Sequence, residues 1–205
     1  MLGLILSFEH GDVMQPSALR IIRDEHLALA AMLRSMGLLV RQAHAAGRTP
    51  DFGVLRAMLF YVDEFPERLH HPKESELLFP LLRERCPELA PVLDRLDSDH
   101  DRGERAIRSL EHAMLAYEVL GESRRAAFEQ ALSQYVDRYL EHMAVEETQV
   151  LPAAQRVLQP AEWQRLDEAF AANRDPATGH PVDDVYRPLF TRITMNAPSP
   201  IGLGT

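Results

Sequence analysis

Cysteine is almost absent from this chain, and its scarcity narrows the possible chemistry. The 205 residues include one cysteine, Cys86. An internal disulfide needs two cysteines, and zinc or iron–sulfur sites built on thiolates need several. These kinds of site are therefore excluded. We interpret Cys86 as a structural residue rather than a reactive thiol, because a free cysteine usually behaves as a small buried hydrophobe.

Positive charge and long apolar runs are scarce as well. The formal net charge is −9 at pH 7 and no basic run occurs, which argues against nucleic acid or an anionic membrane as the main partner. No stretch approaches the roughly 18 apolar residues of a membrane span. The apolar start, Met1–Phe8, lacks a basic leading region and is a poor signal peptide. We therefore expect a soluble, cytoplasmic protein without a membrane partner.

Strand-like alternation is also lacking, whereas helical periodicity is strong. Apolar residues recur at spacings of three and four along four stretches, the first from Leu19 to Val40. Amphipathic helices with short connections predict an all-α fold, an up-down-up-down four-helix bundle. We expect an N-terminal segment at residues 1–16, the bundle at 17–158, and a C-terminal helical extension with a tail at 159–205.

The central motif occurs twice in the sequence. His70–Glu74 and His142–Glu146 both read H-x-x-x-E, and a proline, Pro80 or Pro152, follows each histidine by ten residues. Residues four apart on a helix share one face, about 6 Å apart. An imidazole and a carboxylate so placed can be two ligands of a metal or two halves of an acid–base pair.

An upstream histidine accompanies each motif. His26 precedes His70 by 44 residues, and His100 precedes His142 by 42. Each upstream histidine directly follows an acidic residue and lies in an apolar stripe. The chain thus repeats a unit of one helix with a histidine and a second helix with a histidine and a glutamate. This duplication predicts four helices and six inward-facing ligands.

Several neighbours of the motifs carry weaker expectations. Pro66 and Pro72 lie inside the second predicted helix and should kink or bulge it near His70, because proline lacks a backbone N–H. His71 lies about 100° around an ideal helix from His70, so we expect it outside the group of ligands. We expect Glu147 to face solvent. We expect Tyr139 to pack in the core, and a hydrogen bond at the site is the alternative.

The residue types of the repeated unit suit a transition metal. Burying two carboxylates without a counter-charge costs several kcal/mol each, and a cation supplies that charge. Four imidazoles and two carboxylates are too rich in nitrogen for calcium or magnesium. Two carboxylates from different helices can also bridge two ions. Ferritin-like di-iron bundles carry E-x-x-H motifs; the order here is reversed and the set holds more nitrogen, which argues against that class.

The order H…H-x-x-x-E…H…H-x-x-x-E, with Leu78-Phe79-Pro80 and Leu151-Pro152 downstream, resembles the hemerythrin-like, or HHE cation-binding, proteins over about residues 17–158. The Asp175-Pro176 segment and the Ala-Pro-x-Pro-Ile-Gly tail also resemble bacterial members. The resemblance implies a non-haem di-iron site in a four-helix bundle that handles O₂, NO or peroxide. Carried over by motif, the iron ligands would be His26, His70, Glu74, His100, His142 and Glu146, with both glutamates bridging.

The chain departs from the O₂-carrying hemerythrins at Glu104. Those proteins offer a second histidine on the third helix, four residues after the first, where this chain has Glu104. One iron would lose an imidazole and gain a carboxylate or an open position, so redox or sensing roles are favoured over reversible O₂ carriage. Glu104 is thus a candidate seventh ligand, and a polar core residue is the equal alternative.

Three functions stay open at this point. The first is a di-iron protein for sensing, scavenging, stress response or iron homeostasis. The second is an oxidase, a peroxidase or a factor that repairs iron–sulfur clusters, which the position of Glu104 favours. The third is a structural bundle whose metal, such as zinc, only holds the helices together. No sequence feature names a substrate or an oligomeric state.

Overall fold

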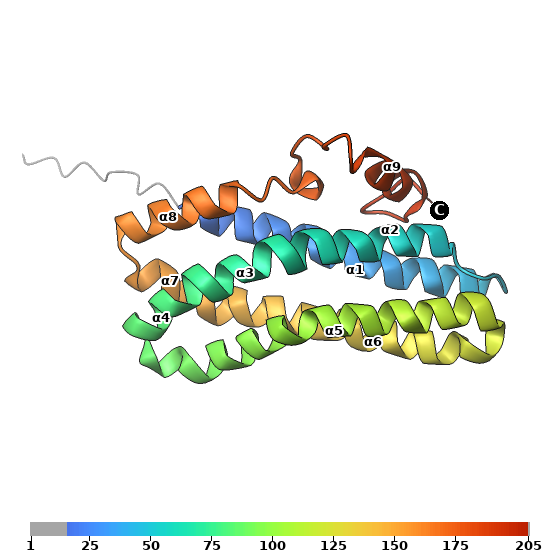
Figure 1. The fold of residues 1–205 in the computed structure, drawn as a ribbon, viewed down its shortest axis with the longest axis horizontal. Helices are drawn as coiled ribbons and strands as arrows, with labels where there is room; N and C mark the ends of the chain where they lie inside the picture. The colour runs from blue at the N-terminus through green and yellow to red at the C-terminus, as the bar shows by residue number, and fades with distance from the viewer. Residues whose placement is uncertain (1–15, 205) are drawn as a thin grey trace, which may run out of the picture.

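A computed structural model describes residues 16–204 of the chain, except for the side chain of Glu104. Four long helices lie side by side and run alternately up and down (Figure 1). The described residues form no β-strand, and one isolated bridge joins Pro198 to Gly204. The predicted all-α class is confirmed. The predicted N-terminal segment lies outside the described residues apart from Pro16.

The bundle helices match the predicted order. They are α1 (Ser17–Ala45); a second helix made of α2 (Phe52–Val62), α3 (His71–Lys73) and α4 (Phe79–Arg85); α5 (Ala90–Leu120); and a fourth made of α6 (Arg125–Val145) and α7 (Leu151–Val157). Asp51 caps α2, because its carboxylate accepts a hydrogen bond from the Val54 N–H at 3.0 Å. At the end of α5, Gly121 has φ +75°, a conformation that favours glycine. Single 3₁₀ turns, Pro87–Leu89 and Gly121–Arg124, lead into α5 and α6.

The second helix widens into π-helical turns, where each N–H bonds the carbonyl five residues earlier. One such turn spans Asp63–His70 and contains Pro66, and another spans Glu74–Leu78. Because proline offers no N–H for the regular bond, the helix takes up an extra residue in the turn around it. The bulge predicted from the internal prolines is present.

The fourth helix widens at the equivalent place. A π-helical turn spans Glu146–Val150 and so begins, like the turn at Glu74, on the glutamate of the motif. Pro80 and Pro152 each lie just beyond one of these turns. The proline shared by both repeats therefore has a structural role: it removes an N–H six residues after the glutamate, and the helix is widened just before it.

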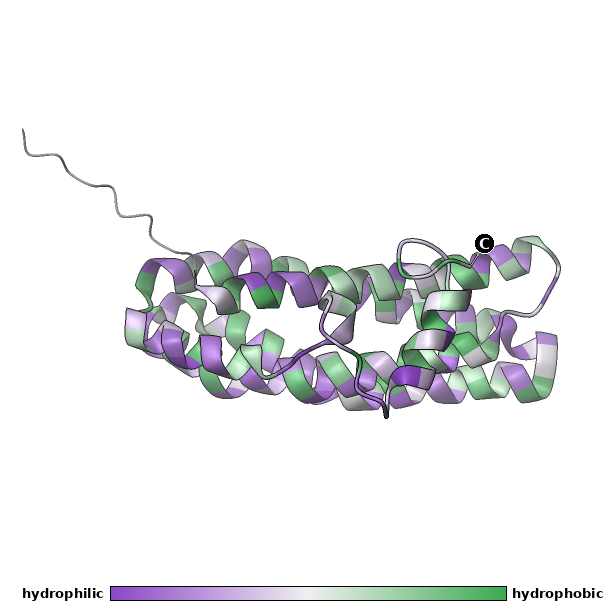
Figure 2. Ribbon diagram, turned by 90° about the horizontal axis from the view of Figure 1, so that it is seen from above, coloured by the Kyte–Doolittle hydropathy of each residue, from purple (hydrophilic) through white to green (hydrophobic). Residues whose placement is uncertain are grey.

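Two apolar cores fill the bundle, one towards each end. One contains residues such as Leu33, Met58 and Phe128, and the other contains Leu19 and Phe79. Hydrophobic and hydrophilic residues alternate along the bundle helices, as amphipathic packing requires (Figure 2). On all four helices the predicted ligands lie at or next to the point where the residues of one core give way to those of the other. The bundle thus contains a polar layer between two apolar ones.

The C-terminal extension covers one side of the bundle. Helix α8 (Pro160–Ala171) lies against α1, and α9 (Arg187–Asn196) lies against α2 (Figure 1). A 3₁₀ turn, Pro176–Thr178, lies between them. Trp163 and Phe170 are buried in the core next to α1, and Ile193 of α9 joins the other core. Among the helices of residues 16–204, none combines the length and apolar character that crossing a membrane requires.

Candidate metal centre

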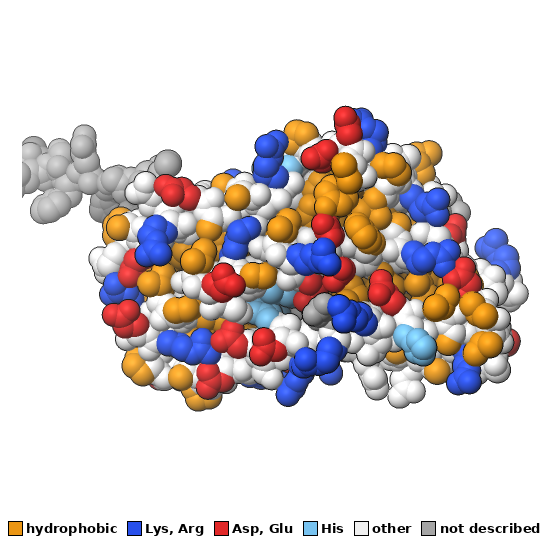
Figure 3. All heavy atoms as spheres, in the orientation of Figure 1, with side chains coloured by type: hydrophobic (Ala, Val, Ile, Leu, Met, Phe, Trp, Pro, Cys, Tyr) orange, Lys and Arg blue, Asp and Glu red, His pale blue; other side chains and the backbone are white. Residues whose placement is uncertain are grey.

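Six of the seven predicted ligands converge in the polar layer. They come from all four bundle helices and are His26, His70, Glu74, His100, His142 and Glu146. Glu74 and Glu146 are almost completely buried, with exposed side-chain fractions of 0% and 1%. His100 is the most exposed of the six, at 7%. In the space-filling view, histidine side chains reach the surface at the centre of the face shown (Figure 3).

The histidines form two pairs. The rings of His26 and His70 have centroids 5.1 Å apart. Those of His100 and His142 are 4.7 Å apart, and their Nε2 atoms approach to 3.0 Å. Each pair joins an upstream histidine to a motif histidine, so each half of the duplicated chain supplies one pair.

The two glutamates lie between these pairs. Glu74 places Oε1 3.2 Å from Nε2 of His70 and Oε2 3.6 Å from Nε2 of His100. Glu146 places Oε2 3.3 Å from Nε2 of His26 and Oε1 3.1 Å from Nε2 of His142. Each carboxylate therefore presents one oxygen to each histidine pair, as a carboxylate that bridges two ions must do.

Carboxylates fix the rings of the first pair from outside. Nδ1 of His70 donates to Oε2 of Glu25 at 2.6 Å, and Nδ1 of His26 donates to Oε1 of Glu147 at 3.1 Å. A proton held on Nδ1 leaves the Nε2 lone pair free to face the centre, the usual arrangement for metal-binding histidine. Glu147 is 42% exposed, so it faces solvent as expected and also holds His26.

The second pair has partners at equivalent sequence positions. Nδ1 of His100 lies 2.8 Å from the Ser75 hydroxyl, and Nδ1 of His142 lies 3.8 Å from the carboxylate of Asp99. Ser75 and Glu147 each follow a motif glutamate, whereas Glu25 and Asp99 each precede an upstream histidine. The roles of these two acids were not predicted from the sequence, although their equivalent positions before the upstream histidines of the repeat could have indicated them.

The inward-facing atoms lack hydrogen bonds. Both oxygens of Glu74 and of Glu146, and the Nε2 atoms of His26 and His70, are buried without a hydrogen-bond partner among the described residues. They lie close to one another but are not aligned for hydrogen bonds. Leaving so many buried polar atoms unsatisfied costs about 1–3 kcal/mol each. A cation would satisfy all of them, and a mixed nitrogen and oxygen donor set fits a transition metal.

The charges of the centre are strongly coupled. Burial lowers the pKa of His26, but the adjacent carboxylates of Glu146 and Glu147 outweigh it and raise the pKa to about 9. Burial and the neighbouring charge of Glu146 raise the pKa of Glu74. Burial alone would also raise the pKa of Glu146, but His142 and His26 hold it well below its usual range. The raised pKa values of His26, His70 and His142 favour protonated rings that offset part of the buried negative charge where no cation does.

His71 lies among the candidate ligands rather than outside them. Its ring is buried and stacks on that of His100, with centroids 4.3 Å apart and planes at 13°. The reason is the widened helix: π-helical turns flank residues 71–73, and in a wider turn successive side chains are separated by a smaller angle. His70 and His71 can therefore both reach the interior.

Two further residues of the sequence predictions, Tyr139 and Cys86, have described positions, and the ligand role of Glu104 stays a prediction. Glu104 lies on α5 one turn after His100, and its side chain is outside the described part of the chain. Tyr139 belongs to an apolar core, as expected, and its ring centroid is 5.9 Å from that of His71. Cys86 is buried in the other core, which agrees with a structural role.

A small cavity adjoins the first histidine pair. It has a volume of about 10 Å³, roughly the room for one water molecule. Its walls come from α1, the second bundle helix and the segment after α8, and include His26, His70, Leu29, Phe65 and Asn173.

The fold and the polar layer together define a metal-binding four-helix bundle. The sequence model of the hemerythrin HHE cation-binding domain matches residues 17–154, and the chain belongs to this family. The match ends before α8, so the C-terminal extension lies outside it. Comparison with curated proteins and with solved structures found no match.

Proposed function

We propose that this protein binds two iron ions, one at each histidine pair, and handles O₂, NO or peroxide in sensing, scavenging or iron homeostasis. The observation that carries the proposal is that Glu74 and Glu146 each direct one carboxylate oxygen to one histidine pair and the second oxygen to the other pair. A single ion at one pair would leave one oxygen of each buried carboxylate without a charge partner. Two ions satisfy both oxygens of both carboxylates.

In this proposal each side chain has a defined task. His26, His70, His100 and His142 are terminal ligands through Nε2, and Glu74 and Glu146 bridge. Glu25 and Glu147 keep the Nδ1 protons in place and make His70 and His26 stronger donors. Iron, when bound, would supply the electrons with which such a centre binds or reduces a small oxidant.

The surroundings support a small ligand rather than an organic substrate. The cavity beside His26 and His70 has room for a molecule of about the size of water. Its wall combines the apolar side chains of Leu29 and Phe65 with polar ones such as Asn173, and its small size suits a diatomic molecule such as O₂ or NO better than an organic substrate.

The test is reconstitution of the metal-free full chain with ferrous iron under anaerobic conditions. We expect about two iron per chain by metal analysis and, after exposure to O₂, near-ultraviolet and visible absorption from ferric iron. Recovery of one zinc and no iron would instead favour the structural bundle. Catalytic turnover of peroxide by the loaded protein would favour the peroxidase alternative.

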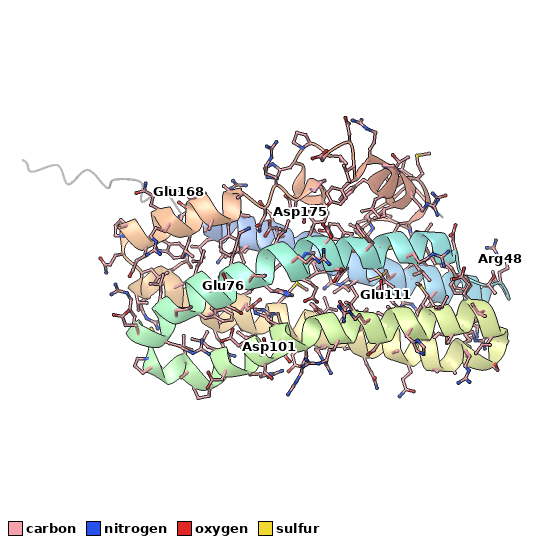
Figure 4. All side chains as sticks on the ribbon, viewed as in Figure 1. Arg48, Glu76, Asp101, Glu111, Glu168 and Asp175 are labelled. Carbon is pink, nitrogen blue, oxygen red and sulfur yellow. The ribbon has the colours of Figure 1, made fainter. Side chains whose placement is uncertain are left out.

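The bridging role is tested by Glu74→Ala and Glu146→Ala. Each change removes negative charge from between the two ions, and the repeat predicts similar losses of iron from both variants. Glu76→Ala is the matched control, because Glu76 lies in the same π-helical turn as Glu74 but is exposed (Figure 4). Full iron content in both glutamate variants would rule out bridging.

A further inference from the structure

The geometry points to His71 as a further metal ligand: we propose that it supplies a third imidazole to the ion held by His100 and His142. The inference rests on the proposed function and deepens it, because it makes the two metal positions chemically different. Sequence spacing gave no reason to include His71, since the widened second helix is what brings it inward.

The three rings surround one space. The centroid of His71 is 4.3 Å from that of His100 and 5.6 Å from that of His142, while His100 and His142 are 4.7 Å apart. One ring nitrogen from each of the three lies within 4.8 Å of the other two. Three neutral imidazoles converging on one point are a donor set for a divalent transition metal.

His71 is oriented as the other ligands are. Its Nδ1 donates to Oε2 of Glu67 at 3.3 Å, one turn earlier on the same helix, and the Glu67 side chain is only 6% exposed. The facing helix makes room for this carboxylate: a Cβ at position 103 of α5 would collide with it, and that residue is Gly103. A buried carboxylate that keeps the ring proton on Nδ1 leaves the Nε2 lone pair free to bind a metal.

Comparison of the two repeats shows that the pair of a third histidine and its carboxylate occurs in the first half of the chain and not at the corresponding residues of the second half. The residues that correspond to Glu67 and His71 in the second half of the chain are Tyr139 and Met143, which place an aromatic ring and a thioether in the core. The other metal position therefore has two imidazoles, both held by carboxylates close to Nδ1. Two positions with such different donors should bind metal in two separate steps.

His71→Phe tests the proposal while keeping an aromatic ring in the stack. Metal-free wild type and variant are titrated anaerobically with Fe(II), and separately with Co(II), whose absorption reports its ligands. We expect wild type to bind two ions, and the variant to bind one ion normally and the second about 100-fold more weakly or not at all. The Co(II) spectrum of the second step should change.

Met143→Phe is the matched control at the corresponding position of the repeat, and it should keep both steps. Two normal binding steps in His71→Phe, with unchanged Co(II) spectra, would overturn the role of His71 but leave the proposed function intact. Fewer than two ions in wild type would instead contradict the proposed function itself.

A second measurement needs no substitution. In wild-type protein loaded with Co(II), the Nδ1–H proton of each coordinated histidine gives a strongly shifted, exchangeable NMR signal. Five such signals would support ligation by His71 together with His26, His70, His100 and His142. Four signals would exclude it, whatever the folding behaviour of the Phe variant.

Discussion

Asn173 connects the C-terminal extension to the candidate centre through a single side chain. Its Nδ2 donates to both carboxylate oxygens of Glu25, at 3.0 and 2.9 Å, and its Oδ1 accepts from Nζ of Lys73. Glu25 in turn holds His70. Asn173 is buried and lies beyond the matched family domain, so part of the support for this histidine comes from outside that domain.

Asn173→Ala should therefore weaken metal binding without removing a ligand. Glu25 would lose its amide donor and hold His70 less firmly, so we expect about a 10- to 100-fold loss of affinity at the His26–His70 position. Stepwise Fe(II) titration measures it. Asn196→Ala is the control, because Asn196 is exposed and donates only to the Arg192 carbonyl of its own helix. Equal affinities in the two variants would show that Asn173 serves folding alone.

At the scale of elements, α8 completes the start of α1. The first turn of a helix leaves N–H groups without partners inside the helix, and Pro16, the residue at the N-cap position of α1, makes no side-chain hydrogen bond to them. Oδ1 of Asp167, on α8, accepts from the Ala18 N–H at 2.6 Å. A residue 149 positions away in the sequence thus acts as the cap. The same hydrogen bond holds α8 against α1, and Asn173 follows shortly after α8.

Asp167→Ala should lower the free energy of unfolding by about 1 kcal/mol, the usual effect of losing a helix cap. Thermal melting of the metal-free protein measures the change. The neighbouring exposed Glu168 (Figure 4) provides the control variant Glu168→Ala, which removes a similar charge without uncapping α1. Identical melting temperatures for the two variants would show that water replaces the Asp167 cap without loss.

The elements could be predicted from sequence because their causes are local. Apolar spacing indicated the four helices, and the H-x-x-x-E repeats indicated six side chains that do lie together. His71 could not be placed, because ideal helical angles do not anticipate a helix widened by proline. Asn173 could not be found either, because its contact with Glu25 joins residues 148 positions apart and depends on how the extension packs against α1.

At the scale of the whole molecule, a buried carboxyl group makes stability depend on pH. Asp175, in the segment between α8 and α9 (Figure 4), accepts from the Tyr61 hydroxyl at 2.6 Å and from the Ala177 N–H at 2.8 Å. Burial raises the pKa of Asp175 from 3.8 to about 6; its two hydrogen bonds oppose the rise, Glu25 adds to it and His70 opposes it. The extension is thus joined to α2 by a group that prefers to be protonated when folded.

The sign of the effect follows from the two pKa values. The folded state holds the Asp175 proton more tightly than the unfolded state, so this group stabilises the fold below about pH 4, and that stabilisation is lost as the pH rises through about 6. Asp175→Asn carries no such proton. The stability of the variant relative to wild type should therefore rise between pH 4 and pH 7, by on the order of 1–3 kcal/mol.

Melting of both metal-free proteins across this pH range, in chelator, measures the difference, and taking the difference cancels the titration of groups common to both. Tyr61→Phe supplies an independent check. Removing the hydroxyl takes away a hydrogen bond that lowers the pKa of Asp175, so the loss of stability in that variant should extend to higher pH than in wild type. A difference between Asp175→Asn and wild type that stays constant from pH 4 to pH 7 would mean that Asp175 is ionised in the folded protein throughout, and that the extension is held to α2 by a charged rather than a protonated group.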